Sequence, residues 1–354
     1  MNKIVKIILI LIVFAIVLCF FCCTKSKTPS IKGKNSVSCM KKVPINGTKQ
    51  HITVRGKNKN LPLLLFVHGG PGFAETSFFR HYNSELEDDF LVVNWDQRGA
   101  GKSYDSSYKD YEFHMSDFVE DIITLSEYLL KEYSQEKLFL VAHSWGTAIS
   151  MLAVSERPDL FHAYVGMGQI ANLPEQEIAS YDFTLKKAKE LNNKKAIEEL
   201  EKIGPPVNGN YKDGLNATEI QRKWLLEFGG AIYKKNNYSD MMKVLFFKTP
   251  EYGLQDKIKW IQSMNIKSKN KMVENEFLPL DLTSKVTKVE IPIYFFLGQH
   301  DYQVDSKCAN NYFNDIDAES KKLVWFMYSA HSPCFEQPDQ FNKMMVELVK
   351  ADCL

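Results

Sequence analysis

The stretch Lys137-Leu138-Phe139-Leu140-Val141-Ala142-His143-Ser144-Trp145-Gly146 passes from an apolar run into a helical pattern with no loop between them. Continuous apolar runs of this length are typical of strands that are buried on both faces. The helical pattern continues through residues 146–156 and stops before Pro158. The sequence therefore predicts a strand, a sharp turn at Ser144 and a helix, with the Ser144 hydroxyl exposed above a sheet.

Strand and helix patterns alternate on both sides of this turn. Apolar runs predict further strands at residues 63–67, 90–95, 162–167, 291–297 and 323–328. Helical spacing predicts helices at residues 116–133, with Ser116 as N-cap, and at 340–350. Asn46-Gly47 between two short apolar runs predicts an antiparallel hairpin. Together these patterns predict an α/β fold with a mostly parallel central sheet.

The strand signal disappears between residues 171 and 288, where the pattern becomes helical and amphipathic. We interpret this segment as a helical cap inserted between two parts of one core, residues 40–170 and residues 289–354. Ligands of α/β sheets bind beyond the carboxyl ends of the strands, so a cap placed there would cover the binding site.

The N-terminal segment is predicted to anchor the chain in a membrane. Residues Ile7–Cys23 carry no charge over seventeen positions and are flanked by lysines. A membrane-spanning helix needs about 17–25 apolar residues. We expect residues 1–28 to form the anchor and residues 29–39 to be a tether. Export followed by signal cleavage is the alternative, and the side of the membrane stays open.

The amino-acid composition indicates which classes of binding partner the chain is not expected to have. The 354 residues carry 44 Lys+Arg and 43 Asp+Glu, which gives a formal charge of +1 and no field that would attract nucleic acid. Seven cysteines are too few for a disulfide scaffold, and no zinc-ligand spacing is present. We therefore expect no nucleic acid, no metal and no cofactor, while the oligomeric state stays open.

A glycine-rich turn follows the strand predicted at residues 63–67. Its sequence is His68-Gly69-Gly70-Pro71-Gly72. Acyl transfer needs backbone N–H donors at the oxygen that becomes negative in the transition state, and glycines let the backbone come close. We assign the Gly70 and Trp145 N–H groups as the candidate oxyanion hole.

An acid and a base follow the last two predicted strands. Proton removal from serine needs an imidazole, and a carboxylate must fix the tautomer of that imidazole. Asp301 and His331 each come directly after a strand, and the order Ser144, Asp301, His331 is the order expected for this architecture. His300 and Asp305 are the rival residues. Asp301 is preferred because it lies on the corner itself, and His331 because it follows the acid.

With these motifs in hand, the chain resembles the α/β-hydrolase superfamily and, within it, the proline iminopeptidase family of serine peptidases. The resemblance rests on residues 68–72, on Asp96-Gln97-Arg98-Gly99 and on the Ser144, Asp301 and His331 positions. Ala142 departs from the glycine that is usual two residues before the serine.

The resemblance implies release of an N-terminal residue from short peptides, with cap glutamates holding the free amine. On this basis Glu227 is a candidate substrate-binding residue, and Glu251 and Asp256 are open candidates for a second acid. Asp96 and Arg98 are expected to form a structural turn that supports the oxyanion loop.

We therefore expect a serine hydrolase that acts through an acyl-enzyme. The preferred interpretation is an aminopeptidase of proline iminopeptidase type. An ester or amide hydrolase without free-amine recognition is the alternative, so the expected partner is a small peptide or ester. A membrane-anchored binding module without catalysis is a further alternative.

Overall fold

The computed structural model describes residues 26–354. The apolar segment Ile7–Cys23 lies outside these residues, so the predicted membrane anchor stays a prediction. Within residues 26–354, no helix combines the length and the apolar character that crossing a bilayer requires.

One eight-stranded sheet organises the chain, and its strand order is β1-β2-β4-β3-β5-β6-β8-β10. The strands are β1 (Val37–Ile45), β2 (Thr48–Gly56), β3 (Leu63–Val67), β4 (Leu91–Asp96), β5 (Leu138–His143), β6 (Phe161–Met167), β8 (Ile293–Gly298) and β10 (Lys321–Phe326). Strand β2 pairs antiparallel with β1 and β4, and the other neighbours are parallel. Strands β7 (Lys288–Val289) and β9 (Asp317–Ala318) form a separate parallel pair. The predicted mostly parallel sheet is confirmed.

The predicted hairpin is also confirmed. Asn46 and Gly47 join β1 to β2 with φ values of 42° and 76°, as a two-residue hairpin turn requires. Strand β1 begins at Val37, so it takes in the last residues of the predicted tether. The chain just before the tether is packed as well, because Thr28 Oγ1 donates to Glu251 Oε1 at 2.9 Å.

Helices cover both faces of the sheet. Helices α3 (Met115–Tyr133), α4 (Trp145–Glu156) and α12 (Ser306–Asp315) pack on one face, which holds Leu63 and Leu65. Helices α2 (Thr76–Tyr82), α13 (Pro333–Glu336) and α14 (Pro338–Met344) pack on the other, which holds Leu64 and Phe66. The C-terminal segment continues from α14 through a π-helical stretch, Met345–Lys350, into α15 (Ala351–Cys353).

The predicted N-cap at Ser116 is wrong. Helix α3 begins at Met115, with His114 in the capping position. The reason is the Asp117 carboxylate, which reaches back and accepts the His114 N–H at 3.1 Å.

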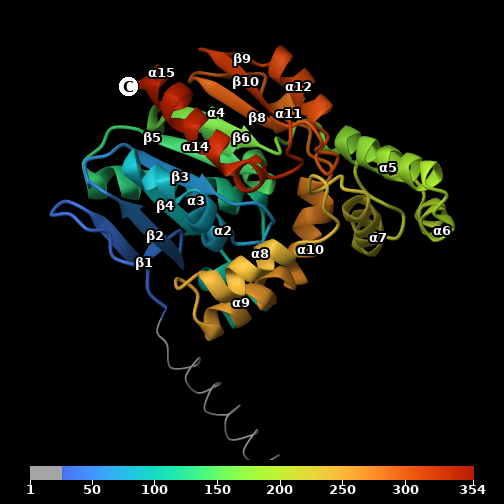
Figure 1. The fold of residues 1–354 in the computed structure, drawn as a ribbon, viewed down its shortest axis with the longest axis horizontal. Coiled ribbons are helices and arrows are strands. Elements are labelled where there is room, and N and C mark those ends of the chain that lie inside the picture. The colour runs from blue at the N-terminus through green and yellow to red at the C-terminus, as the bar shows by residue number, and fades with distance from the viewer. Residues whose placement is uncertain (1–25) are drawn as a thin grey trace, which may run out of the picture.

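The segment between β6 and β7 is helical, as predicted, and forms two groups (Figure 1). Helices α5 (Leu173–Glu190), α6 (Lys194–Ile203) and α7 (Leu215–Glu227) project beside the sheet around a core of their own that includes Tyr181 and Trp224. The second group comprises α8 (Ser239–Lys243), α9 (Leu254–Met264) and α10 (Ser268–Met272), and α11 (Leu282–Lys285) leads back to the core. Trp260 of α9 is buried and donates from Nε1 to Ala74 O at 2.8 Å, which fixes this group on the core.

A buried ion pair joins the loop after β4 to helix α3. Arg98 Nε and Nη2 each lie 2.7 Å from a different oxygen of Asp121. Both side chains are almost fully buried. Gln50 Nε2 and Asn46 Nδ2 also donate to the Asp121 carboxylate, at 2.6 and 2.9 Å. Arg98 is therefore a structural residue, as expected, but its partner is Asp121 and not Asp96.

We predict that Asp121→Ala lowers the free energy of unfolding by about 3 kcal/mol, because it removes the two short hydrogen bonds to the buried Arg98 guanidinium and leaves the longer ion pair with Asp117, at 3.5 Å. Urea unfolding followed by circular dichroism measures the loss. Asp159→Ala is the matched control, since the Arg157–Asp159 pair is exposed on the surface and its removal costs less than about 1 kcal/mol. Equal losses in the two variants would contradict the prediction.

Candidate active site

Ser144 lies on the sharp strand-to-helix corner that the sequence predicts. Its φ and ψ are 54° and −123°, a conformation that side-chain-bearing residues rarely adopt. Strand and helix are very close here, because a Cβ at Gly146 would lie 2.4 Å from Val67 O. The Ser144 N–H donates to Met167 O at 2.8 Å and so ties the corner to β6.

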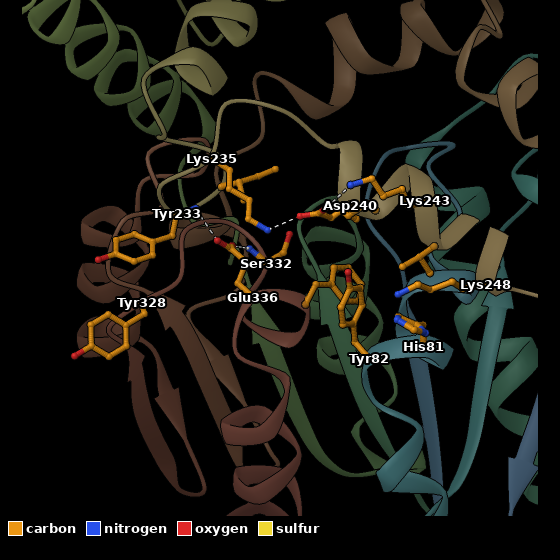
Figure 2. Close-up of a pocket in the computed structure, with 14 residues that line it drawn as sticks. His81, Tyr82, Tyr233, Lys235, Asp240, Lys243, Lys248, Tyr328, Ser332 and Glu336 are labelled. Atoms are coloured by element: carbon orange, nitrogen blue, oxygen red, sulfur yellow. Dashed lines mark hydrogen bonds and ion pairs between the residues drawn. The ribbon is translucent and has the colours of Figure 1, made fainter. Parts of the chain in front are cut away.

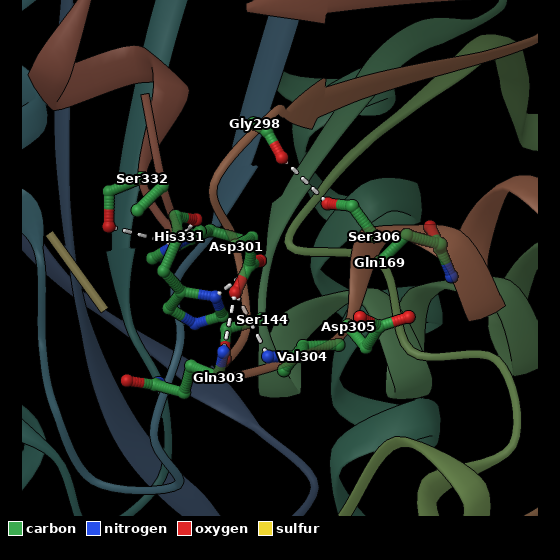
Figure 3. Close-up of polar contacts among 12 residues, drawn as sticks. Ser144, Gln169, Gly298, Asp301, Gln303, Val304, Asp305, Ser306, His331 and Ser332 are labelled. Carbon is green, nitrogen blue, oxygen red and sulfur yellow. Dashed lines mark hydrogen bonds and ion pairs between the residues drawn. The ribbon is translucent and has the colours of Figure 1, made fainter. Parts of the chain in front are cut away.

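Asp301 and His331 come together, as predicted, beyond the carboxyl ends of β8 and β10. His331 Nδ1 lies 2.9 Å from Asp301 Oδ2, and Asp301 Oδ1 accepts the Gln303 and Val304 N–H groups at 2.9 and 3.0 Å. Figure 3 shows this arrangement around the His331 ring. A proton on Nδ1 faces the carboxylate, which leaves Nε2 as an acceptor. Nε2 is buried and has no hydrogen-bond partner among residues 26–354.

The two rival residues have structural roles. Asp305 caps α12, and its Oδ1 accepts the Lys307 and Cys308 N–H groups, both at 3.0 Å. His300 stacks on Tyr233 with ring centroids 4.5 Å apart. The geometry therefore favours Asp301 and His331 over them.

The oxyanion hole assigned to Gly70 and Trp145 stays a prediction, and two observations bear on it. Gly70 lines the cavity that contains Ser144, and Trp145 is the first residue of α4. Neither backbone N–H donates to another residue in the part of the chain that the structure describes. Gly70 has a φ of 127°, and a Cβ there would lie 2.5 Å from Gly72 N, so a glycine is needed.

Gln97 connects the two signature motifs and the serine corner. It donates from its backbone N to His68 Nε2 at 3.1 Å and from Nε2 to His68 O at 2.7 Å. Its Oε1 accepts the Trp145 indole N–H at 3.0 Å. Gln97 therefore supports the oxyanion loop directly, and Asp96 supports the end of this loop, since its Oδ1 accepts the Thr76 hydroxyl at 2.6 Å.

The structure does not bring Glu227 to this cavity of about 260 Å³. Glu227 is exposed at the end of α7, with Asn236 Nδ2 3.5 Å from its carboxylate. The cavity is lined by Gly69, Gly70, Phe73, Glu75, His143, Ser144, Ala231, Tyr238, Met241, Gln303, His331 and Ser332. Glu251 and Asp256, the open candidates for a second acid, are absent from this lining; Glu251 contacts Thr28, and Asp256 contacts Lys102.

A second carboxylate–imidazole pair, which the sequence reasoning missed, lies in the same cavity. Glu75 is buried and accepts hydrogen bonds from the Gly69 N–H at 3.0 Å and from His143 Nδ1 at 2.9 Å. His143 Nε2 lies 3.1 Å from His331 O. Nε2 also lies 3.3 Å from Ser332 Oγ. An oxygen acceptor faces each ring nitrogen, which favours the imidazolium form. The pair links the oxyanion loop to the backbone of His331.

The charges of this pair agree with its contacts. Burial alone would lower the pKa of His143, but the charge of Glu75 and its hydrogen bond outweigh burial, and the pKa is raised. Burial would raise the pKa of Glu75, but the charge and hydrogen bond of His143 and the Gly69 N–H lower it. In the sequence, a histidine directly before Ser144, His143, was the signal that could have pointed to this pair.

A buried lysine lies behind the oxyanion loop without a carboxylate partner among the described residues. Lys269 Nζ donates to Gly99 O at 3.0 Å and to Ser263 O at 3.2 Å. Its burial lowers its pKa from 10.5 to about 7.

Comparison with known proteins finds relatives of this chain. The family model described as alpha/beta hydrolase fold matches residues 62–196. A probable aminopeptidase, YbaC of Bacillus subtilis, is 31% identical over 314 residues, which is 88% of this chain and 96% of that protein. A proline iminopeptidase of Lactobacillus acidophilus is 26% identical over 111 residues, 31% of this chain and 36% of that protein.

Solved structures share the fold at low identity. A proline iminopeptidase from Mycobacterium smegmatis superposes with a TM-score of 0.63 at 16% identity, over 88% of this chain and 98% of its own. A bacterial membrane phospholipase A superposes with a TM-score of 0.62 at 15% identity, over 98% of this chain and 97% of its own. Because both identities are low, these similarities concern the fold alone.

We predict that Glu75→Gln slows the reaction of Ser144 with a fluorophosphonate by on the order of 10-fold, because displacing the oxyanion loop or the His331 backbone misaligns the attacking serine. Gel-based labelling over time measures the rate. Glu251→Gln is the matched control, since Glu251 is equally buried but lies outside the cavity. Unchanged labelling in folded Glu75→Gln protein would contradict the prediction.

We predict that Lys269 makes stability rise with pH above pH 7. Its folded pKa of about 7 lies below its unfolded value of 10.5, so the unfolded state binds more protons between these values. The unfolding free energy of the natural chain minus that of Lys269→Met should increase by about 2 kcal/mol from pH 7 to pH 9. Urea unfolding at both pH values measures it, and a constant difference would refute it.

Proposed function

The chain belongs to the α/β-hydrolase family, and from this premise we propose that it is a serine hydrolase of aminopeptidase type, which releases the N-terminal residue of short peptides through an acyl-enzyme. One observation carries the proposal. The half-buried Ser144, on its strained corner, shares one cavity with an imidazole that a carboxylate holds and whose Nε2 is free, and the N–H groups of Gly70 and Trp145 are unpaired within the described part of the chain.

The reaction begins with attack of Ser144 Oγ on the carbonyl carbon of the scissile bond. His331 Nε2 takes the serine proton, and Asp301 stabilises the imidazolium through Nδ1. The Gly70 and Trp145 N–H groups bind the oxygen that becomes negative. His331 then protonates the leaving amine, and the amine departs.

Water releases the acyl group by the same steps. It occupies the place of the leaving amine, gives its proton to His331 Nε2 and attacks the acyl carbon. Collapse of the second tetrahedral intermediate returns the proton to Ser144. Every proton transfer uses His331.

The similarity to the probable aminopeptidase supports the peptidase assignment, since it extends over 88% of this chain. An ester hydrolase is the second candidate, and one observation favours it. The cap contributes Ala231, Tyr238 and Met241 to the lining of the Ser144 cavity, and none of these is a carboxylate that could hold a free amine.

A substrate panel tests the proposal. We expect hydrolysis of aminoacyl-arylamides with a free amine, and at least about 10-fold slower hydrolysis of the same compounds after N-acetylation, because the charged amine no longer contributes to binding. Hydrolysis of p-nitrophenyl esters without cleavage of any free aminoacyl-arylamide would refute the peptidase and support the ester hydrolase.

We expect Ser144→Ala to lower kcat by at least about 10⁴-fold and to abolish fluorophosphonate labelling, because the nucleophile is gone. Ser155→Ala, at the exposed end of the same helix, is the control and should retain both. Absence of labelling in the natural chain, or equal labelling in Ser144→Ala, would instead favour a binding module without catalysis.

A further inference from the structure

A second cavity, of about 480 Å³, adjoins the Ser144 cavity (Figure 2). The two cavities share Met241 and Ser332 in their linings. The volume lies within the range of small-molecule binding sites. The lining residues are His81, Tyr82, Ile232, Tyr233, Lys235, Asp240, Met241, Lys243, Val244, Lys248, Tyr328, Ser332, Phe335 and Glu336.

The shared residue Ser332 places this second cavity on the leaving-group side. Ser332 follows His331 directly in the chain, and His331 Nε2 is the group that protonates the leaving amine in the proposed reaction. A leaving group must lie next to its proton donor. A substrate whose leaving part extends past Ser332 would therefore enter the second cavity.

Positive charge exceeds negative charge in this cavity. Asp240 is shared by two lysines, at 2.7 Å from Lys235 Nζ and 3.0 Å from Lys243 Nζ. Lys248, beside His81 in Figure 2, forms no ion pair with any residue of 26–354. One carboxylate thus faces three ammonium groups.

The other carboxylate in the lining is already occupied. Glu336 Oε1 accepts the Ala330 and Ser332 N–H groups at 3.1 and 3.0 Å, and Oε2 accepts the Tyr233 N–H at 2.7 Å. These bonds hold Glu336 against the loop that carries His331. Counting both carboxylates and the three lysines, the lining keeps one excess positive charge.

We propose that this second cavity binds the C-terminal carboxylate of the leaving part of the substrate, with Lys248 and Lys243 as its cationic partners. The inference rests on the proposed function and names the substrate class: di- and tripeptides with a free C-terminus. Tyr82, Val244 and Phe335 supply apolar surface for the side chain of the leaving residue. A longer peptide would carry its carboxylate beyond the lysines.

The test compares a dipeptide that has a free carboxylate with the same dipeptide as its C-terminal amide. We expect the natural chain to have about 5-fold higher kcat/KM for the free acid, the upper end of what an ion pair contributes at an exposed site. The preference should appear in KM and should fall as salt is raised, because the lysines are exposed.

The variant Lys248→Gln, alone and with Lys243→Gln, should reduce the preference to less than about 2-fold and leave kcat/KM unchanged for an aminoacyl-arylamide, whose leaving group carries no carboxylate. Lys234→Gln is the matched control, since Lys234 is an exposed neighbour that does not line the cavity.

The outcomes separate the two proposals. Cleavage of the arylamide together with equal rates for acid and amide, or a preference that survives both lysine substitutions, overturns the carboxylate site and leaves the aminopeptidase standing. Failure to cleave any aminoacyl compound overturns both.

Discussion

The close contact between strand β3 and helix α4 is the constraint on which the site depends. A Cβ at position 146 would lie 2.4 Å from Val67 O, so helix and strand leave no space for a gradual turn. The chain must reverse at Ser144, which accounts for its positive φ and for the accessible side of its half-buried side chain. Parallel strands end at one edge of the sheet, so the segments after β3, β8 and β10 reach the same place. The contact between β3 and α4 thus fixes the position of Ser144, and the oxyanion loop, Asp301 and His331 must lie near that position.

The sheet does not fix the conformation of the loops at its edge. Hydrogen bonds between these loops determine where their residues lie. Gln97 holds His68 and the Trp145 indole, so the loop after β4 positions the oxyanion loop and the start of α4 together. Glu75 and His143 act across the cavity, from the Gly69 N–H to His331 O. Burial makes such bonds costly to break, because a lost partner leaves a polar group unsatisfied. The two loops and the imidazole are therefore parts of one connected network.

The sequence predicts those features that depend on local order along the chain. Ser144, Asp301 and His331 could be found because each lies within a few residues of the end of a strand, and the hairpin because Asn46-Gly47 has its own turn geometry. Glu227 could not be placed, since the position of α7 depends on packing within the cap, which has its own core. Glu75 and His143 are far apart in the sequence, and no local pattern shows that they meet.

The charge pattern of the two cavities limits where substrate charge can be recognised. In the Ser144 cavity Glu75 is balanced by the His143 imidazolium, and the cap adds no carboxylate to its lining. The adjoining cavity keeps an excess of lysine charge around Asp240. Coulomb attraction is therefore stronger for an anionic group beyond the scissile bond than for a cationic group before it. Selection by the leaving side would also restrict length, because only a short leaving group places its carboxylate within reach of these lysines.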